Sequence, residues 1–474
     1  MFTIFHPELD RLSREVVARH RDFDAGKWQP DELLGHQRAA IRETLRHVRE
    51  RSPFYRDRLG ALTDANIDSF EPADLARLPF TTKDDLRTHL LDLLSKPISD
   101  GWIFYETTGT TGRATPCPRD NVDSIVNNTA LTINYQSILD AHPGRHFVGI
   151  MGPTELHSTG DTFGDVFRNL GHAVAKLWPH SPVVGFQRAL EVMREFGITA
   201  LVCTPGMVMS LAKEAEKLGL DPRGDFDIRF IMVVGELVTP QLLRNLGSLW
   251  NAKTYSSMYA SQESSILAAG HADERLRTIP LNAYYEIVDP ETGEPMVPDE
   301  HGVWTGELVI THLYQGCKPL VRYRTGDLVR MLPESATASY PAPTLEPLGR
   351  AKDMVTINGV SSYAHDLENQ ILASVSHCYG YQIELDRVAG DDRLTIRLEL
   401  ARSASDPAAI RAAVEEDVRG AYGVVPSVEF GALSSVAGTG AMVSWKAARV
   451  HDRRHGPDAE RAAALALARQ RDER

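Results

Sequence analysis

The chain has 474 residues, more than one hydrophobic core usually serves, so two or more domains are expected. Hydrophobic residues make up 42% and charged residues 24%, which is ordinary for a globular protein, and the net charge of −13 makes nucleic acid or an anionic membrane surface a poor partner. The 4 cysteines are widely spaced, which argues against a CxxC metal site or a dense disulfide frame and favours reduced thiols in a cytoplasmic protein.

The N-terminal segment MFTIFHPELDRLSREVV reaches the charge of Glu8 without an apolar run, so no signal peptide is expected. No run of about 18 apolar residues occurs along the chain, so no membrane span is expected. Residues 31–60 have apolar side chains at helical spacing, interrupted at Pro53. In the phrase DLARLPFTTKDDLR that follows, Thr81 or Thr82 is the expected N-cap of a short helix.

From about residue 121, short apolar strands alternate with amphipathic helices. This pattern predicts a parallel sheet covered on both faces, with ligands at the carboxyl ends of the strands. The expected helices cover residues 121–141, 185–197 and 206–220, and the expected strands cover residues 146–151, 198–204 and 228–235.

After residue 280, short β runs with Gly-containing turns predict a smaller, more antiparallel part. The segment from residue 351 mixes strands with helices and ends in an Ala/Arg-rich tail. The predicted fold class is therefore α/β: a large N-terminal domain over residues 1–350, with mostly parallel sheets flanked by helices and a small β subdomain, and a smaller α+β C-terminal domain over residues 351–474.

The stretch TTGTTGR, residues 107–113, could hold an anion. Glycines let a backbone approach phosphate closely, and hydroxyls and consecutive amides supply donors. It lacks the GxxxxGK[ST] pattern of a Walker A loop. The alternative is a flexible surface loop.

Four later motifs are weak when each is taken alone. An isolated Asp after a Gly is usually an ordinary turn, and a Lys among Arg is usually a solvated basic face. The motifs are SMYASQES (257–264), YRTGDL (323–328), GRAKDM (349–354) and VSWKAARVHDRR (443–454).

In this order, the motifs resemble those of the adenylate-forming (ANL) superfamily, which contains AMP-producing acyl-CoA synthetases, adenylation domains and luciferases. The phrases PFYRDRL (53–59) and LPFTTKDDLR (78–87) are similar to phrases of its phenylacetate–CoA ligase branch. The resemblance spans roughly residues 35–455, and the combination of motifs is specific although no single motif is.

The resemblance implies roles for individual residues. Lys446 would reach the nucleophilic oxygen and the α-phosphate, Glu263 would bind Mg²⁺, and Lys352 would be the hinge of a mobile C-terminal lid. The implied ATP and AMP contacts, with Lys446 among them, are Thr107, Thr108, Gly109, Thr110, Thr111, Gly112, Gly235, Glu236, Tyr259, Gln262, Asp327 and Arg350.

Three positions depart from the family pattern. Gln262 replaces a hydroxyl residue, although an amide can still donate to phosphate, and Ala260 replaces a Gly. Trp445 replaces the Gly before the implied catalytic lysine, which puts CoA as acceptor in doubt.

The expected acid pocket, MGPTELHSTGDTFGD (151–165), is polar where phenylacetate ligases are apolar. Its side chains either face a polar substrate or cap a helix that begins near residue 162, with Asp161 as the candidate N-cap. The predicted substrate-binding residues are Gly152, Glu155, His157, Ser158 and Ala260.

The resemblance therefore implies a ligand set of ATP, Mg²⁺ and a small-molecule acid, with CoA or a carrier protein as acceptor. The predicted function is an AMP-forming ligase that adenylates a polar, aromatic or amino-substituted carboxylic acid, in secondary metabolism. Two alternatives keep adenylation but change the second step: an ATP-dependent diazotase that activates nitrite for an aromatic amine, or an amide-forming ligase. A third is a non-catalytic nucleotide-binding relative. Similar ligases commonly form homodimers.

Overall fold

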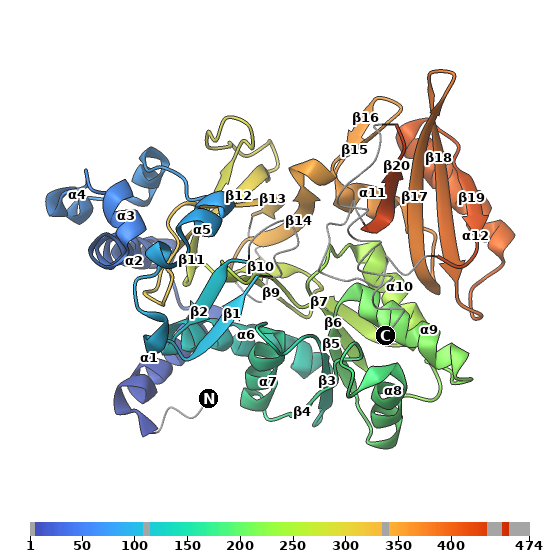
Figure 1. The fold of residues 1–474 in the computed structure, drawn as a ribbon, viewed down its shortest axis with the longest axis horizontal. Coiled ribbons are helices and arrows are strands. Elements are labelled where there is room, and N and C mark those ends of the chain that lie inside the picture. Colours follow the sequence, from blue (N-terminus) through green and yellow to red (C-terminus); the bar gives the residue numbers. More distant parts are fainter. Residues whose placement is uncertain (1–4, 108–113, 334–340, 434–447, 455–474) are drawn as a thin grey trace. The chain divides into compact units, whose positions relative to one another are not determined.

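The computed structural model describes residues 5–107, 114–333, 341–433 and 448–454 (Figure 1). The chain divides into two compact units. Unit 1 comprises Met1–Pro143, Pro153–Leu170 and Met258–Glu346, and unit 2 comprises Gly144–Gly152, Gly171–Ser257 and Pro347–Arg474. This division into compact units differs from the predicted domain boundary at residue 350. The predicted boundary separates a C-terminal part that is expected to move during the reaction, and it stays a prediction.

Unit 1 begins with helices that pack on a sheet. Thr82, one of the two predicted N-cap residues, is the N-cap of α5, because its side chain accepts a hydrogen bond from the Asp85 amide. Ile41 and Leu45 share a core with Leu308 and Ile310 of the sheet. The helices are α1 (Pro7–Asp24), α2 (Pro30–Arg51), α3 (Pro53–Arg58), α4 (Asp64–Asp68) and α5 (Lys83–His89), with 3-10 turns at Pro72–Arg77, Leu90–Leu93 and Ile98–Asp100.

The sheet of unit 1 has 7 strands in the order β11-β12-β13-β14-β10-β9-β8. The pairings between β8 and β9, β9 and β10, β10 and β14, β11 and β12, and β12 and β13 are antiparallel, which confirms the expectation for the region after residue 280. Its strands are β8 (Met258–Ser261), β9 (Ser265–Gly270), β10 (Leu276–Thr278), β11 (Ala283–Val288), β12 (Trp304–His312), β13 (Tyr323–Leu332) and β14 (Thr344–Arg350).

A two-stranded hairpin and two helices complete unit 1. Strands β1 (Ile103–Glu106) and β2 (Pro116–Arg119) pair antiparallel, and residues 107–115 connect them. The predicted helix at 121–141 is α6 (Asn121–Ala141). Helix α7 (Thr159–Asn169) begins earlier than predicted: Ser158 is its N-cap and Asp161 lies in its first turn, so the N-cap assignment to Asp161 was wrong.

Unit 2 contains the predicted parallel sheet. Its 5 strands follow the order β4-β3-β5-β6-β7, and all of their pairings are parallel. The strands are β3 (Phe147–Met151), β4 (Ala173–Lys176), β5 (Ala200–Cys203), β6 (Phe230–Val233) and β7 (Lys253–Ser256), and the helices are α8 (Gly185–Glu195), α9 (Pro205–Lys217) and α10 (Pro240–Trp250).

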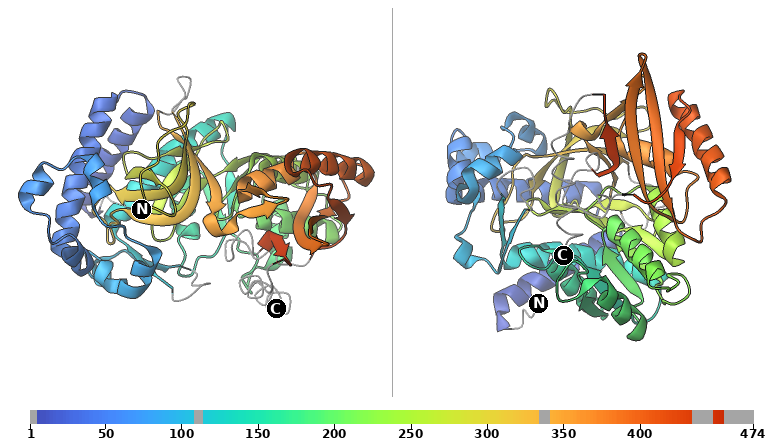
Figure 2. Two further views of the ribbon diagram at one scale, coloured as in Figure 1. Left: turned by 90° about the horizontal axis from the view of Figure 1, so that it is seen from above. Right: turned by 45° about the vertical axis from the view of Figure 1, so that its right-hand side comes forward.

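The C-terminal segment of unit 2 packs against α9 and α10, and its apolar side chains share one core with them. Figure 2 shows the long hairpin of β17 and β18 with α12 beside it. Asn245 of α10 exchanges two hydrogen bonds with the backbone of Cys378. The elements are β15 (Val355–Ile357), β16 (Val360–Ser362), α11 (Ala364–Ile371), β17 (Cys378–Val388), β18 (Asp391–Leu400), α12 (Pro407–Tyr422), β19 (Ser427–Phe430) and β20 (Val450–Asp452).

Among the described residues, every helix is too short or too polar to cross a lipid bilayer.

Candidate active site

Glu263 is the centre of the polar groups of unit 1. It lies in the turn between β8 and β9, and only 7% of its surface is exposed. Its Oε1 lies 3.2 Å from Lys83 Nζ and accepts a hydrogen bond of 3.1 Å from the Tyr323 hydroxyl. A buried carboxylate needs such partners, because an unpaired buried charge is costly.

The partners of Glu263 also keep it ionised. Burial alone would raise its pKa, but the charge of Lys83, a backbone hydrogen bond and the charge of Lys318 together hold the pKa below its usual value. An ionised carboxylate oxygen is a ligand that Mg²⁺ prefers. Glu263 therefore fits the metal-binding role that the sequence predicts for it.

A second carboxylate, Asp327, lies in β13 where its pairing with β12 shifts in register. Gly326 has a φ of 77°, a conformation that glycine adopts without strain, and its amide donates to Glu307. The Tyr259 hydroxyl donates to Asp327 Oδ2 at 2.7 Å. The structure thus brings together the residues that are predicted to contact adenine and ribose.

Thr107 closes the base of the Gly/Thr loop. Its amide donates to the Thr115 carbonyl at 3.1 Å, and its Oγ1 accepts from the Thr115 amide at 2.9 Å. Thr108, Gly109, Thr110, Thr111 and Gly112 lie outside the described residues, so their role as a triphosphate cradle stays a prediction.

Gln262 links the end of β1 to the predicted acid-binding segment. Ser158 Oγ donates to Gln262 Oε1 at 2.6 Å, and Gln262 Nε2 donates to the Glu106 carbonyl at 3.5 Å. The Glu106 amide donates in turn to the Leu156 carbonyl at 3.0 Å. A residue predicted to contact phosphate and one predicted to contact the acid therefore share a direct hydrogen bond.

The other predicted acid-binding residues of unit 1 differ in exposure. Glu155 is exposed to solvent, whereas His157 and Ala260 are half-buried. Burial and the charge of Arg119 lower the pKa of His157 to about 4, and its Nδ1 accepts from the Thr159 amide. His157 is therefore neutral at pH 7, and Glu155 shows no contact that suggests a pocket.

The predicted site residues of unit 2 form a separate group. Gly152 is buried after β3, and Gly235 has a φ of 87° in the exposed loop after β6. The Glu236 carboxylate accepts from the Gly206 amide at 3.3 Å, and burial raises its pKa although the charge of Arg449 opposes this. Its side chain therefore holds the start of α9, which leaves the loop backbone for an adenine contact.

Arg350 and Lys352 are exposed at the end of β14 and in the 3-10 turn Ala351–Asp353. Lys446 and Trp445 lie outside the described residues. The catalytic role of Lys446 and the hinge role of Lys352 stay predictions.

One other group in the described part of the chain has the composition of a metal site. Asp120, Asp123 and Cys317 offer ligand atoms within 4.8 Å of one another. Lys96 already pairs with Asp120, and the Asp120 and Cys317 amides donate to Asp123. Burial and the neighbouring charge of Asp120 raise the pKa of Asp123 to about 7, so the group is better explained as a helix cap than as a cation site.

Sequence analysis missed three residues that belong to these networks: Lys83, Tyr323 and Arg119. The first two lie inside phrases that the analysis had singled out, TTKDDLR and YRTGDL, but the phrases alone do not say which side chains reach Glu263. Arg119 follows the Gly/Thr loop and had no recognisable pattern.

Comparison with known proteins identifies the family. The sequence profile of the AMP-binding enzyme family matches residues 101–313. Phenylacetate–coenzyme A ligase of Pseudomonas putida is 30% identical over 382 residues, which cover 78% of this chain and 82% of the relative. The enzyme of the same name from Escherichia coli strain K12 is 29% identical over 391 residues, which cover 79% and 84%.

Solved structures show the same fold. A 2-hydroxyisobutyryl-CoA ligase in the postadenylation state, in complex with 2-HIB-AMP, gives a TM-score of 0.72 at 21% identity and covers 94% of this chain and 92% of that chain. The same enzyme in the thioesterification state with 2-HIB-AMP and CoA gives a TM-score of 0.62, with 94% of each chain covered. With the identity to the Pseudomonas putida relative, these findings show that the chain belongs to the phenylacetate–CoA ligase branch of the adenylate-forming (ANL) superfamily, the AMP-forming acid–thiol ligases.

Proposed function

We propose that the protein is an ATP-dependent ligase that adenylates a polar carboxylic acid, aromatic or amino-substituted, and passes the acyl group to CoA or a carrier protein in secondary metabolism. The network around Glu263 in unit 1 carries this proposal. A buried carboxylate that stays ionised can bind the Mg²⁺ that adenylation requires.

The described residues give the adenylation step a chemical basis. Glu263 would hold Mg²⁺, which neutralises charge that develops on phosphate oxygens during attack at the α-phosphorus. Tyr259 and Asp327 would hold the nucleoside, and the Gln262 amide would donate to a phosphate oxygen. The hydrogen bond between Gln262 and Ser158 supports an acid site next to that phosphate.

The acceptor in the second step is the less supported half of the proposal. Relatives named as CoA ligases support CoA. The bulky Trp445 beside the predicted catalytic lysine is the feature that argues against it. The proposal therefore includes a carrier-protein thiol as the other acceptor.

The test is ATP–pyrophosphate exchange with a pooled acid library, with mass spectrometry to identify the adenylate. We expect exchange with the wild type and a loss of about 100-fold or more in Glu263→Gln, which keeps the shape but removes the charge. Glu346→Gln is the matched control, since Glu346 pairs with Arg330 elsewhere in unit 1.

The second step is measured by adding CoA. Thioester formation supports the proposal. AMP release with nitrite and an aromatic amine, without CoA, would replace it with a diazotase, and ATP binding without exchange for any acid would contradict it.

A further inference from the structure

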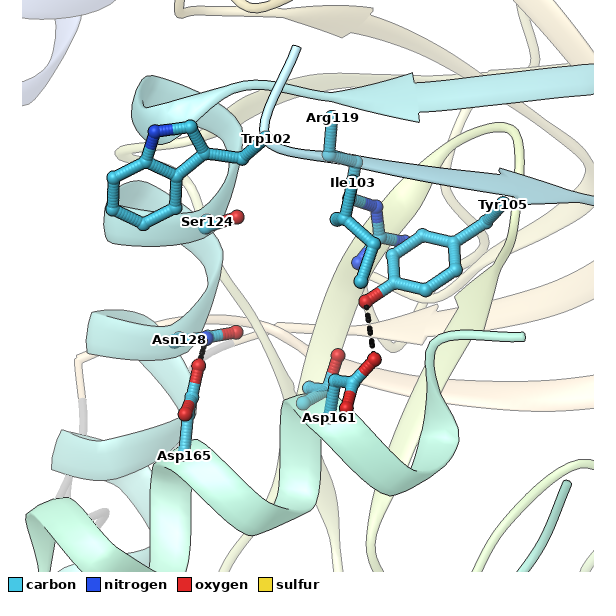
Figure 3. A pocket seen from close by; sticks show the side chains of 9 residues that line it. Trp102, Ile103, Tyr105, Arg119, Ser124, Asn128, Asp161 and Asp165 are labelled. Atoms are coloured by element: carbon cyan, nitrogen blue, oxygen red, sulfur yellow. Dashed lines mark hydrogen bonds between the residues drawn. The ribbon is translucent and has the colours of Figure 1, made fainter. Parts of the chain in front are cut away.

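A cavity of about 370 Å³ lies in unit 1 between the β1–β2 hairpin and helices α6 and α7 (Figure 3). Its volume suits a small molecule. It is lined by Trp102, Ile103, Tyr105, Arg119, Ser124, Asn128, Asp161, Thr162 and Asp165.

The cavity and the candidate active site share two structural elements, β1 and α7. Tyr105 precedes Glu106, whose carbonyl accepts from Gln262, and Asp161 follows Ser158, which donates to Gln262. The cavity therefore shares β1 and α7 with the hydrogen bonds that join the predicted phosphate and acid contacts.

Arg119 places a buried cation at this cavity. Only 7% of Arg119 is exposed, its Nε has no hydrogen-bond partner, and its guanidinium lies 5.3 Å from the centre of the Tyr105 ring. In the described part of the chain, it forms no ion pair. A buried guanidinium is costly without an anionic partner, and an aromatic face offsets only part of that cost.

The field of this cation reaches the acid-binding segment. The charge of Arg119, together with burial, lowers the pKa of His157. Burial and the charge of Asp161 raise the pKa of Tyr105, and the charge of Arg119 opposes this increase. Arg119 therefore lies close enough to His157 and Tyr105 to influence the pKa of both.

Two carboxylates lie on α7, one turn apart, on the opposite wall. Asp165 pairs with Arg168 at 2.6 Å and accepts from Asn128 at 3.3 Å, so its charge is compensated. Asp161 accepts from the neutral Tyr105 hydroxyl at 3.1 Å, and Figure 3 shows the two side chains pointing toward one another. A carboxylate can accept from several donors at once. The cavity thus presents a cation on one wall and a carboxylate on the other.

We propose that this cavity selects an amino-substituted dicarboxylic acid as the substrate: Arg119 binds the carboxylate that is not activated, and Asp161 binds the amino group. This inference rests on the proposed adenylating function and names its substrate class. The apolar surfaces of Trp102, which is 42% exposed, and Ile103 would contact the carbon skeleton.

The carboxylate at Arg119 is the remote one for an energetic reason. The attacking carboxylate loses its negative charge when it becomes an acyl-adenylate. An ion pair to Arg119 at that group would be lost during the reaction, which works against catalysis because binding would favour the ground state. A second carboxylate keeps its charge throughout and keeps the guanidinium paired.

The test uses two sets of four acids in ATP–pyrophosphate exchange. In the first set, propionate carries neither group and β-alanine carries the amine. Succinate carries the second carboxylate, and aspartate carries both groups. Benzoate, 3-aminobenzoate, isophthalate and 5-aminoisophthalate repeat the design on a ring. For the scaffold that the enzyme accepts, we expect kcat/KM to rise about 10- to 100-fold with the second carboxylate, as for a hydrogen bond between charged groups, and to rise again with the amine.

Variants assign each preference to one residue. Arg119→Gln should remove the preference for the second carboxylate but keep that for the amine, and Asp161→Asn should do the reverse. Arg119→Lys keeps the charge and should retain part of the preference. Arg56→Gln and Asp140→Asn, both on the exposed surface of unit 1, are the matched controls.

A second readout does not depend on activity. If Arg119 is an uncompensated buried charge, Arg119→Met should raise the melting temperature of the ligand-free protein. An unchanged or lower melting temperature in a folded variant would contradict this part of the inference.

The outcomes separate the inference from the proposed function. No exchange with any acid, the pooled library included, contradicts the proposed function. Exchange with acids that lack a second anionic group, equal in the wild type and Arg119→Gln, contradicts only the inference.

Discussion

The two hydrogen bonds of the His312 ring in unit 1 depend on its protonation state. Its Nε2 donates to the Ser264 carbonyl at 2.9 Å, next to Glu263, and its Nδ1 accepts from the Leu320 amide at 3.2 Å. Only the neutral ring can make both bonds, because a protonated ring has no acceptor. Burial lowers its pKa to about 4, although the bond to Ser264 opposes this, and the charges of Lys318 and Arg119 lower it further.

This shift predicts that His312 makes the protein sensitive to acid. Its folded pKa of about 4 lies below the usual 6.5, so the unfolded chain binds the proton more strongly between these values. Stability from this residue is full above pH 6.5 and falls as the pH drops toward 4, by about 3 kcal/mol.

His312→Gln tests this expectation, because glutamine can donate to Ser264 and accept from Leu320 without titrating. Urea unfolding from pH 7 to 4 should give a smaller loss of stability in this variant than in the wild type. The exposed His301→Gln should follow the wild-type curve, and equal losses in all three proteins would contradict the assignment.

At the scale of elements, periodicity predicted the helices and strands that bury a broad apolar face. Helix α6 and strands β3, β5 and β6 lie within the expected ranges. Helix α1 was not predicted, because it buries only a thin stripe of Val16, His20 and Phe23. The start of α7 was misplaced because Ser158 occupies the N-cap position without a capping hydrogen bond from its side chain. Its hydroxyl donates to Gln262 instead, and a local sequence pattern cannot show a partner that is so distant along the chain.

The contact between α10 and β17 gives a prediction at this scale. Asn245 donates to the Cys378 carbonyl at 2.8 Å and accepts from its amide at 2.9 Å, and both residues are buried. Asn245→Ala would leave two buried backbone groups unpaired, each at a cost of about 1–3 kcal/mol.

We expect Asn245→Ala to lower the urea midpoint and to speed hydrogen exchange at the Cys378 amide. Gln187→Ala, which removes an exposed hydrogen bond from α8, should do neither. Unchanged exchange at Cys378 would show that the contact does not hold the two elements together.

For the whole molecule, the order of motifs predicted the family and the fold class, because several motifs in one fixed order are specific although no single motif is. The compact units were not predictable in the same way. They follow from side-chain packing, such as the core that helices α11 and α12 and strands β17 and β18 share with α9 and α10, which a sequence pattern does not display. The lining of the Arg119 cavity is also beyond reach, since it combines two strands and two helices from separate stretches of chain.

The predicted motion of residues 351–474 can be tested by locking this segment to α10. The backbone amide of Gln241 in α10 donates to Asn369 Oδ1 of α11 at 3.2 Å, so Gln241→Cys with Asn369→Cys places one thiol on each side of this contact, while the 4 native cysteines are buried. If the segment moves between adenylation and acyl transfer, oxidation should preserve one partial reaction and slow the other by about 100-fold, since a misplaced catalytic group costs that much. Exchange and thioester assays before and after reduction measure both steps, with each single variant as its control. Equal rates for both steps in the oxidised protein would show that the segment completes the reaction without leaving α10.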